Sequence, residues 1–262
     1  PAGVVAAPAP TGSLAAVTTA PPEVDTDRRA PRWGVADLVV GFLVAQVASF
    51  AGFVAFAAAE GVPVEDLDTD TLAIGEIALL QVPLWLGLLG VPLLATRLRG
   101  NGPVADLGWW TTWRDAPVGL AIGVACQFVL VPLVTLPVFL LSDVDQEDLA
   151  APARELTDRA TGAGVIVLVL VVVVMAPLAE EVFFRGMLQR TLARSWPAWA
   201  AMLATALLFA ASHFQGVQFP ALAAFGLVLS VLAHRTGRLG LCTWAHVGFN
   251  ATTVALLLAE RG

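Results

Sequence analysis

Long apolar stretches recur along this chain, and short polar segments between them carry most of the charge. A helix that crosses a bilayer needs about 20 mostly apolar residues. Seven stretches meet or approach that length: residues 34–59, 72–96, 116–141, 163 to about 190, 197–214, 219–233 and 239–259. The pattern predicts an all-α fold, a polytopic membrane helix bundle with about seven transmembrane helices.

The first 32 residues differ from the rest, because they are rich in Pro, Ala and Thr. They lack the basic start and unbroken apolar run of a secretory signal. We therefore expect residues 1–32 to form a flexible cytoplasmic tail. Residues 33–262 are expected to form one integral membrane domain of a multi-pass cell-membrane protein.

Composition narrows the function classes. The chain is 58% hydrophobic and 13% charged, against about 45–50% and about 25% in soluble domains. It has 14 basic and 21 acidic residues, for a net charge of -7, so no basic domain is present to bind nucleic acid. Cys126 and Cys242 lie inside apolar runs and are interpreted as core residues.

The arginines predict the orientation. All 14 basic residues are Arg, and seven alternating crossings from a cytoplasmic amino end put 11 of them on or near the inner side. Only Arg154, Arg159 and Arg261 fall outside, and residues 60–76 and 142–161 between the helices are acidic. Because cytoplasmic loops carry an excess of Arg and Lys, the amino end is predicted to be cytoplasmic and the carboxyl end external.

Prolines interrupt several of the predicted spans and are expected to kink them, since each removes one backbone hydrogen bond. In a membrane such breaks are tolerated where neighbouring helices or a wet cavity satisfy the freed carbonyl. The prolines concerned are Pro83, Pro92, Pro132, Pro137 and Pro177.

The fourth span carries charges, which are costly inside a membrane. Adjacent helical residues point about 100° apart, so Glu180 and Glu181 cannot share one face. Glu181 and Arg185 are four residues apart, which permits an ion pair along the helix. Glu180 is then left to face a cavity. The alternative is a helix end with a solvated cluster of charges.

Two histidines fall in later spans. His213 follows Phe209 by one helical turn, and His246 precedes Asn250 by the same interval. A His and an Asn on one face inside a membrane need hydrogen-bond partners, because they lose those of water. His234, at a predicted helix end, is interpreted as solvated.

Helix rise places these groups at comparable depths. Counted from the inner ends of their helices, the depths of Glu180, His213 and His246 in the bilayer agree within the length of a side chain or two. The fourth, fifth and seventh spans are therefore expected to bring them into one pocket in the inner half of the bilayer.

Three motifs resemble those of the CAAX protease and bacteriocin-processing (CPBP, or Abi) family of intramembrane proteases. They are Glu-Glu-x-x-x-Arg at 180–185, Phe-x-x-x-His at 209–213 and His-x-x-x-Asn at 246–250, in the family's order and in separate predicted spans. The resemblance covers roughly residues 163–259, the protease-like core. The first three spans match only in being hydrophobic.

The resemblance implies an intramembrane endopeptidase that hydrolyses membrane-associated protein or peptide substrates. Glu180 would be the catalytic carboxylate, and His213 would help it to hold and deprotonate water. His246 and Asn250 would stabilise the oxyanion, while the supporting residues would be Glu181, Arg185 and Phe209. The chemistry agrees, since burial raises the pKa of a glutamate towards that of a useful base, and Asn and His can donate to an oxyanion.

The need for a metal is left open by the motifs. The family is often called metalloprotease, and Glu180, His213 and His246 are residue types that ligate Zn²⁺. The His-Glu-x-x-His motif of zincins is absent, which favours the glutamate mechanism without a fixed cofactor. Ser212 points about 100° away from His213, which disfavours a serine mechanism.

Two other functions remain as alternatives. A proton-coupled transporter or channel also uses membrane Glu and His, although no inverted repeat supports it. A non-catalytic immunity or scaffold protein is the other, and the intact motif set argues against it. An Arg-only, Ala-rich chain is typical of a GC-rich bacterium, where prenylated CAAX substrates are not expected.

Overall fold

The computed structural model describes residues 30–261, so the predicted tail lies almost wholly outside the described part of the chain. The described residues form helices and turns and contain no strand. The elements are α1 (Val35–Glu60), η1 (Val64–Asp66), η2 (Thr69–Thr71), α2 (Ile74–Trp85), η3 (Leu86–Gly90), α3 (Val91–Arg99), α4 (Pro103–Leu107), α5 (Asp115–Ala125), η4 (Cys126–Leu130), α6 (Val131–Leu141), α7 (Gln146–Arg159), α8 (Gly164–Leu168), η5 (Val169–Met175), α9 (Ala176–Glu181), η6 (Val182–Gln189), α10 (Arg190–Leu192), α11 (Ala198–Ala211), α12 (Phe219–Thr236) and α13 (Gly240–Ala259).

Consecutive elements join into long helices. Six of these are long and apolar enough to cross a membrane, and α11 is a shorter apolar helix of 14 residues. The prediction of an all-α, polytopic membrane helix bundle is confirmed. The fifth stretch differs from expectation, because its helix ends at Ala211 and not near residue 214. The chain turns there, with a left-handed φ of 54° at Phe214.

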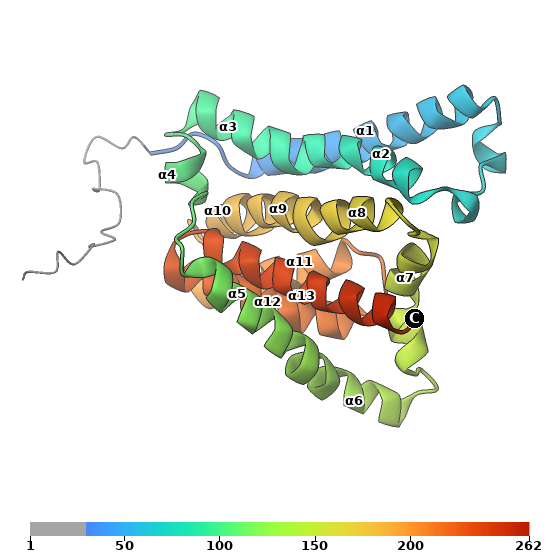
Figure 1. Cartoon of the computed structure of the whole chain (residues 1–262). Coiled ribbons are helices and arrows are strands. Elements are labelled where there is room, and N and C mark those ends of the chain that lie inside the picture. Colours follow the sequence, from blue (N-terminus) through green and yellow to red (C-terminus); the bar gives the residue numbers. More distant parts are fainter. Residues whose placement is uncertain (1–29, 262) are drawn as a thin grey trace, which may run out of the picture.

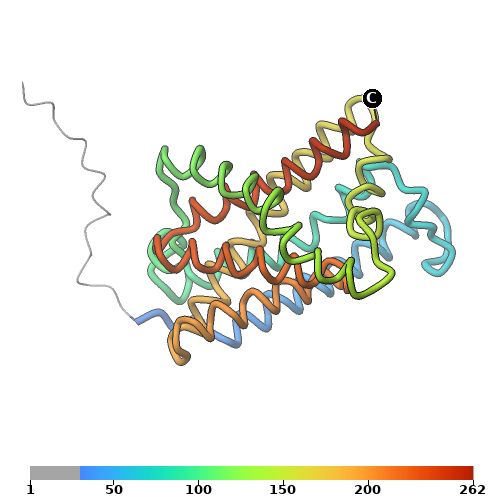
Figure 2. Tube along the Cα trace, turned by 90° about the horizontal axis from the view of Figure 1, so that it is seen from below, coloured from blue at the N-terminus to red at the C-terminus, as the bar shows by residue number. Residues whose placement is uncertain are grey.

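The helices run side by side between two ends of the molecule (Figures 1 and 2). The helix from α8 to α10 lies in the middle of the bundle in Figure 1, with α1 to α3 on one side of it and α5, α12 and α13 on the other. The described chain starts at one end, and its carboxyl terminus lies at the opposite end.

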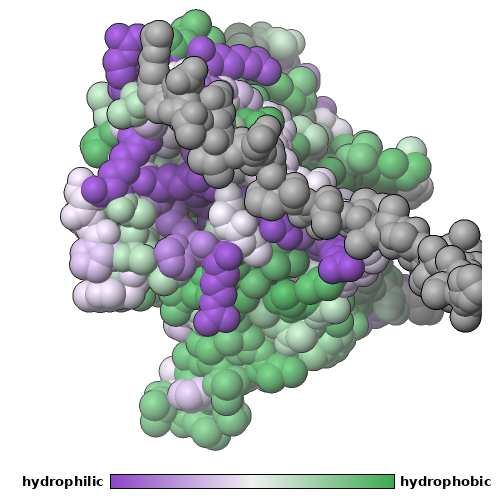
Figure 3. Space-filling model, turned by 90° about the vertical axis from the view of Figure 1, so that its left-hand side faces the viewer, coloured by the Kyte–Doolittle hydropathy of each residue, from purple (hydrophilic) through white to green (hydrophobic). Residues whose placement is uncertain are grey.

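Hydrogen bonds tie together the segments at each end. At the first, which we call the arginine-rich end, Arg190 Nη2 lies 2.6 Å from the Gly237 carbonyl oxygen, and Arg238 forms an ion pair of 2.7 Å with Asp115. The hydrogen bonds that Arg238 donates to Asp115 raise the pKa of its guanidinium. Hydrophilic side chains gather on this end (Figure 3).

The opposite end holds the three arginines that were predicted to lie apart from the others. Arg154 pairs with Glu260 at 2.7 Å, and Arg159 donates to the Thr69 carbonyl at 2.7 Å. Arg261 donates to the Ala160 carbonyl at 3.0 Å. Arg154, Arg159 and Arg261 therefore lie at the opposite end of the molecule from Arg190 and Arg238.

Three of the prolines follow widened, π-helical turns. The segments η3, η4 and η5 directly precede the helices that carry Pro92, Pro132 and Pro177 in their first turn. A proline ring clashes with the carbonyl four residues earlier, and a π turn relieves that crowding. The fourth π segment, η6, has no proline after it, and it lies at the site described below.

Small residues bring α5 and α13 into close contact. A Cβ atom on Gly123 would lie 2.2 Å from the Ala245 carbonyl oxygen, and one on Gly248 would lie 2.7 Å from that of Leu120. Membrane helices pack through such small residues because the backbones can then approach closely. This packing fixes the helix that carries His246.

The topology predicts the side on which each end of the chain lies. Reporter fusions after Arg99 and after Gly262 should report opposite compartments, with the Arg99 fusion cytoplasmic, because positive loops are retained inside. Paired fluorescent and alkaline-phosphatase reporters measure this directly. Reports from the same compartment would mean an even number of crossings between the two fusion points, and the predicted number of helices would then be wrong.

Candidate active site

A buried ion pair lies at the centre of the candidate site. Arg185 Nη1 is 2.8 Å from Glu181 Oε1, and both side chains are fully buried. Arg185 Nη2 also donates to the Gly226 carbonyl of α12 at 2.9 Å, and the guanidinium lies 4.4 Å from the centre of the Phe209 ring. The pairing predicted from the spacing of four residues is confirmed.

His246 of α13 contacts both glutamates. Its Nδ1 lies 2.9 Å from Oε1 of Glu181, and its Nε2 lies 3.8 Å from Oε2 of Glu180. An ionised carboxylate only accepts hydrogen bonds. Nδ1 of His246 therefore carries a proton, and the partner of Nδ1 fixes the ring so that Nε2 faces Glu180.

The two adjacent glutamates have different environments. The Glu181 side chain is fully buried against Arg185, whereas 21% of the Glu180 side chain is exposed. Glu180 therefore points away from the ion pair towards a more open space, as the 100° between neighbouring residues predicts. The alternative of a solvated charge cluster is wrong for Glu181 and Arg185.

Aromatic rings enclose His246. The Phe209 ring packs edge-on against His246 at 5.7 Å and against His213 at 4.8 Å, and Phe225 packs against His246 at 5.5 Å. Phe209 and Phe225 are almost completely buried. Edge-to-face packing fixes the orientation of a ring and excludes water from its faces. Phe209 thus supports the site by contact with Arg185 and with both histidines.

His213 lies beside this group at the end of α11. Its Nδ1 is 2.8 Å from the carbonyl oxygen of Phe209, one turn earlier. Within residues 30–261, no hydrogen bond or ion pair joins His213 to Glu180. The structure therefore brings Glu180 and His246 together directly, and it links His213 to them through the ring of Phe209.

Asn250 faces the same central helix as His246, as their spacing predicts. Its Nδ2 donates to the Val172 carbonyl of η5 at 2.8 Å. In a π turn the carbonyl of Val172 pairs with the nitrogen five residues later, and that residue is Pro177, which has no N–H. Asn250 therefore satisfies a carbonyl that the proline leaves free.

Two contacts of this site did not emerge from the sequence. Gln189 donates to the Ser230 carbonyl of α12 at 3.0 Å, parallel to the bond from Arg185 to Gly226. A signal was present, because Glu181, Arg185 and Gln189 recur every four residues in an apolar helix. The rings of Phe225 and Phe249 stack behind His246, with their centres 4.0 Å apart, and no spacing in the sequence indicates this contact.

The remaining candidates behave as interpreted. Cys126 and Cys242 are buried free thiols, and His234 is exposed near the end of α12. Within the described part of the chain, no three His, Cys, Asp or Glu side chains gather as a metal site requires. Catalytic zinc takes three protein ligands, so the set of Glu180, His213 and His246 does not fit zinc in this geometry.

Comparison with known proteins agrees with the motifs. Residues 162–252 match the family model described as Type II CAAX prenyl endopeptidase Rce1-like. The chain is also 38% identical over 98 residues to a protein of Escherichia coli named "Uncharacterized 24.3 kDa protein". That similarity covers 36% of this chain and 44% of the relative, thus less than half of its length. No solved structure matches the chain.

The family match contains all three motifs of the candidate site, since it runs from residue 162 to residue 252. It confirms the resemblance to the CAAX-protease type for this segment of a multi-pass membrane protein. Residues before 162 lie outside the match.

Removing one member of the buried pair is predicted to destabilise the protein. Arg185→Ala leaves the fully buried Glu181 carboxylate without its cation, which typically costs about 3–5 kcal/mol. The double variant Glu181→Gln/Arg185→Gln should lose less than the sum of Glu181→Gln and Arg185→Gln, because it removes both charges of the pair together. Thermal unfolding in detergent measures both effects.

The control is Arg154→Ala, which breaks exposed pairs with Glu147 and Glu260 and should change the melting temperature little. A melting temperature of Arg185→Ala equal to that of the wild type would contradict the structural role of the pair.

Proposed function

We propose that this protein is an intramembrane endopeptidase of the CAAX-protease and bacteriocin-processing type. It would hydrolyse peptide bonds of membrane-associated protein substrates with a water molecule activated by Glu180. The observation that carries the proposal is the position of Glu180 Oε2, 3.8 Å from His246 Nε2. The family match to an endopeptidase supports the class of reaction.

Glu180 is the proposed general base. Its carboxylate is the more exposed of the two, with 21% of the side chain accessible, so a water molecule and a peptide can reach it. The carboxylate accepts a proton as the water oxygen attacks the carbonyl carbon, and then returns that proton to the leaving amine. His213 would help to hold the water, since Nδ1 bonds the Phe209 carbonyl and leaves Nε2 free.

His246 and Asn250 are the proposed donors to the oxyanion. With protons on both ring nitrogens, His246 donates from Nδ1 to Glu181 and from Nε2 to the oxyanion. An asparagine amide has two N–H groups, and that of Asn250 uses one of them on Val172. Donors that are already oriented need no reorganisation as charge develops on the oxygen.

The separation of base and donor suits this reaction. Each group must reach about 2.8 Å from an oxygen bonded to the same carbon. At 3.8 Å apart, Glu180 and His246 can act on the attacking oxygen and on the carbonyl oxygen together. Glu181 and Arg185 act as positioning residues, because they hold His246 and do not face the reacting carbon.

Glu180→Gln is predicted to abolish most of the proteolysis. The amide keeps the shape of the side chain but cannot accept the proton of water, so the cleavage rate should fall by the roughly 10²–10⁴-fold typical of a lost general base. The substrate is first identified by trapping proteomics, which compares membranes from cells that express wild type and Glu180→Gln. Cleavage of that substrate is then measured in detergent.

Two matched variants separate catalysis from folding. Glu181→Gln should lower activity together with the melting temperature, because it breaks the buried pair. His234→Ala, at an exposed position, should leave both unchanged. Full activity of Glu180→Gln would overturn the mechanism. Loss of wild-type activity with a chelator and its return with Zn²⁺ would overturn the version without a metal.

A further inference from the structure

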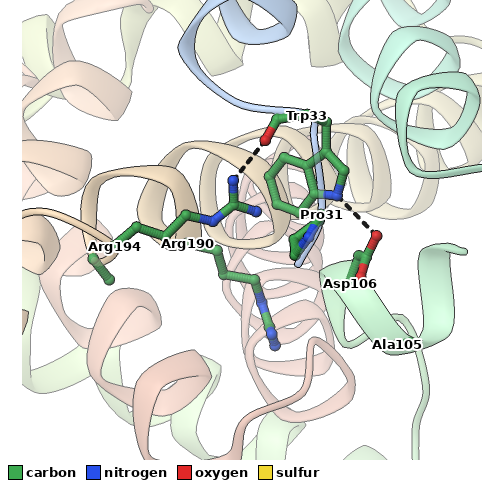
Figure 4. Close-up of a pocket in the computed structure, with 7 residues that line it drawn as sticks. Pro31, Trp33, Ala105, Asp106, Arg190 and Arg194 are labelled. Atoms are coloured by element: carbon green, nitrogen blue, oxygen red, sulfur yellow. Dashed lines mark hydrogen bonds between the residues drawn. The ribbon is translucent and has the colours of Figure 1, made fainter. Parts of the chain in front are cut away.

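A cavity that is open to the surface and lined by charged side chains lies at the arginine-rich end, apart from the candidate active site. It has a volume of about 330 Å³, and its lining includes Pro31, Trp33, Asp106, Arg190 and Arg194 (Figure 4). Arg190 lies nine residues beyond Glu181 in the same continuous helix, on the order of 13 Å along its axis. None of the residues of the proposed mechanism lines this cavity.

Two arginines of this cavity have no carboxylate partner among residues 30–261. Arg190 donates to the Gly237 carbonyl at 2.6 Å. Arg194 donates to the Trp33 carbonyl at 2.5 Å, and its guanidinium lies 3.9 Å from the centre of the Trp33 ring. Backbone carbonyls thus hold both guanidinium groups in place, but they do not neutralise the charges.

The one carboxylate that lines the cavity is already used. Asp106 accepts hydrogen bonds from Trp33 Nε1 at 2.8 Å, from the Asn101 backbone N–H at 2.8 Å and from the Asn101 side-chain amide at 3.0 Å. Figure 4 shows the Trp33 ring between the side chains of Arg194 and Asp106. Asp106 therefore positions the tryptophan, and the cavity keeps a net charge of +1, from two arginines and one aspartate.

Tryptophans mark this end of the molecule as the level of the lipid head groups. Trp side chains are enriched where the hydrocarbon of a membrane meets water. Trp110 stacks with Arg238 at this end, and three further tryptophans here are exposed residues, at 72% for Trp113, 48% for Trp196 and 67% for Trp199. A lipid head group thus lies at the same depth as the cavity.

We propose that this cavity binds the phosphate of an anionic phospholipid head group. Guanidinium groups match phosphate oxygens with paired N–H donors, and each arginine uses only one such donor on a carbonyl. Binding would join the segment before α1, helix α4 and helix α10, and α10 continues the helix that carries Glu180.

Short-chain lipids test this with the full-length protein in neutral detergent. Dihexanoyl phosphatidylglycerol should raise the melting temperature saturably, because a ligand that binds only the folded state stabilises it. Dihexanoyl phosphatidylcholine and inorganic phosphate at the same concentrations should not. An equal rise with inorganic phosphate would overturn the lipid as ligand, and no rise with phosphatidylglycerol would overturn the site.

A pair of double variants locates the site. Arg190→Gln/Arg194→Gln should weaken the apparent affinity for phosphatidylglycerol by about tenfold or more, since charge-assisted hydrogen bonds are lost. Arg97→Gln/Arg235→Gln removes the same charge from exposed positions at the same end and should leave the affinity nearly unchanged. Equal weakening by both pairs would overturn the proposal. If the first pair does not purify, Arg194→Gln against Arg235→Gln makes the same comparison.

Discussion

The fully buried pair of Glu181 and Arg185 is the constraint on which the candidate site depends. Two charges inside a membrane bundle lose their hydration, and their mutual attraction repays this only when further hydrogen bonds satisfy the remaining groups. Two such bonds are present, from His246 on α13 to Glu181 and from Arg185 to the Gly226 carbonyl on α12, whereas Glu181 Oε2 and Arg185 Nε have no hydrogen-bond partner among the described residues. The Phe209 ring of α11 covers the guanidinium. The pair therefore specifies how these helices pack, as well as holding one side chain.

The same pair gives two neighbouring glutamates different surroundings. Glu181 is paired with Arg185 and hydrogen-bonded to His246. Glu180 keeps an accessible carboxylate that faces the other nitrogen of the same imidazole. The contacts thus run from Arg185 through Glu181 and His246 to Glu180, and in the proposed mechanism Glu181 orients the histidine as a carboxylate does in a catalytic triad.

Much of the fold follows from the sequence, because apolar runs of membrane length leave little freedom in placing helices. Motif spacing also gave the pairing of Glu181 with Arg185 and the common face of His246 and Asn250. It did not give the partner of His246, since the choice between two adjacent glutamates depends on how α13 rotates against the central helix. Nor did it give the short α11, which ends at a turn that places His213 on a helix end.

Two further contacts could not be predicted from the sequence, because they depend on local backbone geometry. The π turn before Pro177 frees the Val172 carbonyl, and Asn250 then serves as its donor. That link needs the register of a π turn, which the presence of proline suggests but does not specify. The anchoring of Trp33 on Asp106 likewise joins residues 73 positions apart, and no periodic pattern marks either one.

The protonation state of His246 reports directly on whether Glu181 holds this imidazole. The chain has only three histidines, so ¹⁵N-histidine labelling with His213→Ala and His234→Ala variants assigns every imidazole signal. We expect that Nδ1 of His246 carries a proton in the wild type and that Glu181→Gln, with Arg185 unchanged, shifts the distribution of protons between Nδ1 and Nε2. A neutral His246 ring with its only proton on Nε2 would contradict the hydrogen bond from Nδ1 to Glu181, because Glu181 would then have no proton to accept from the ring.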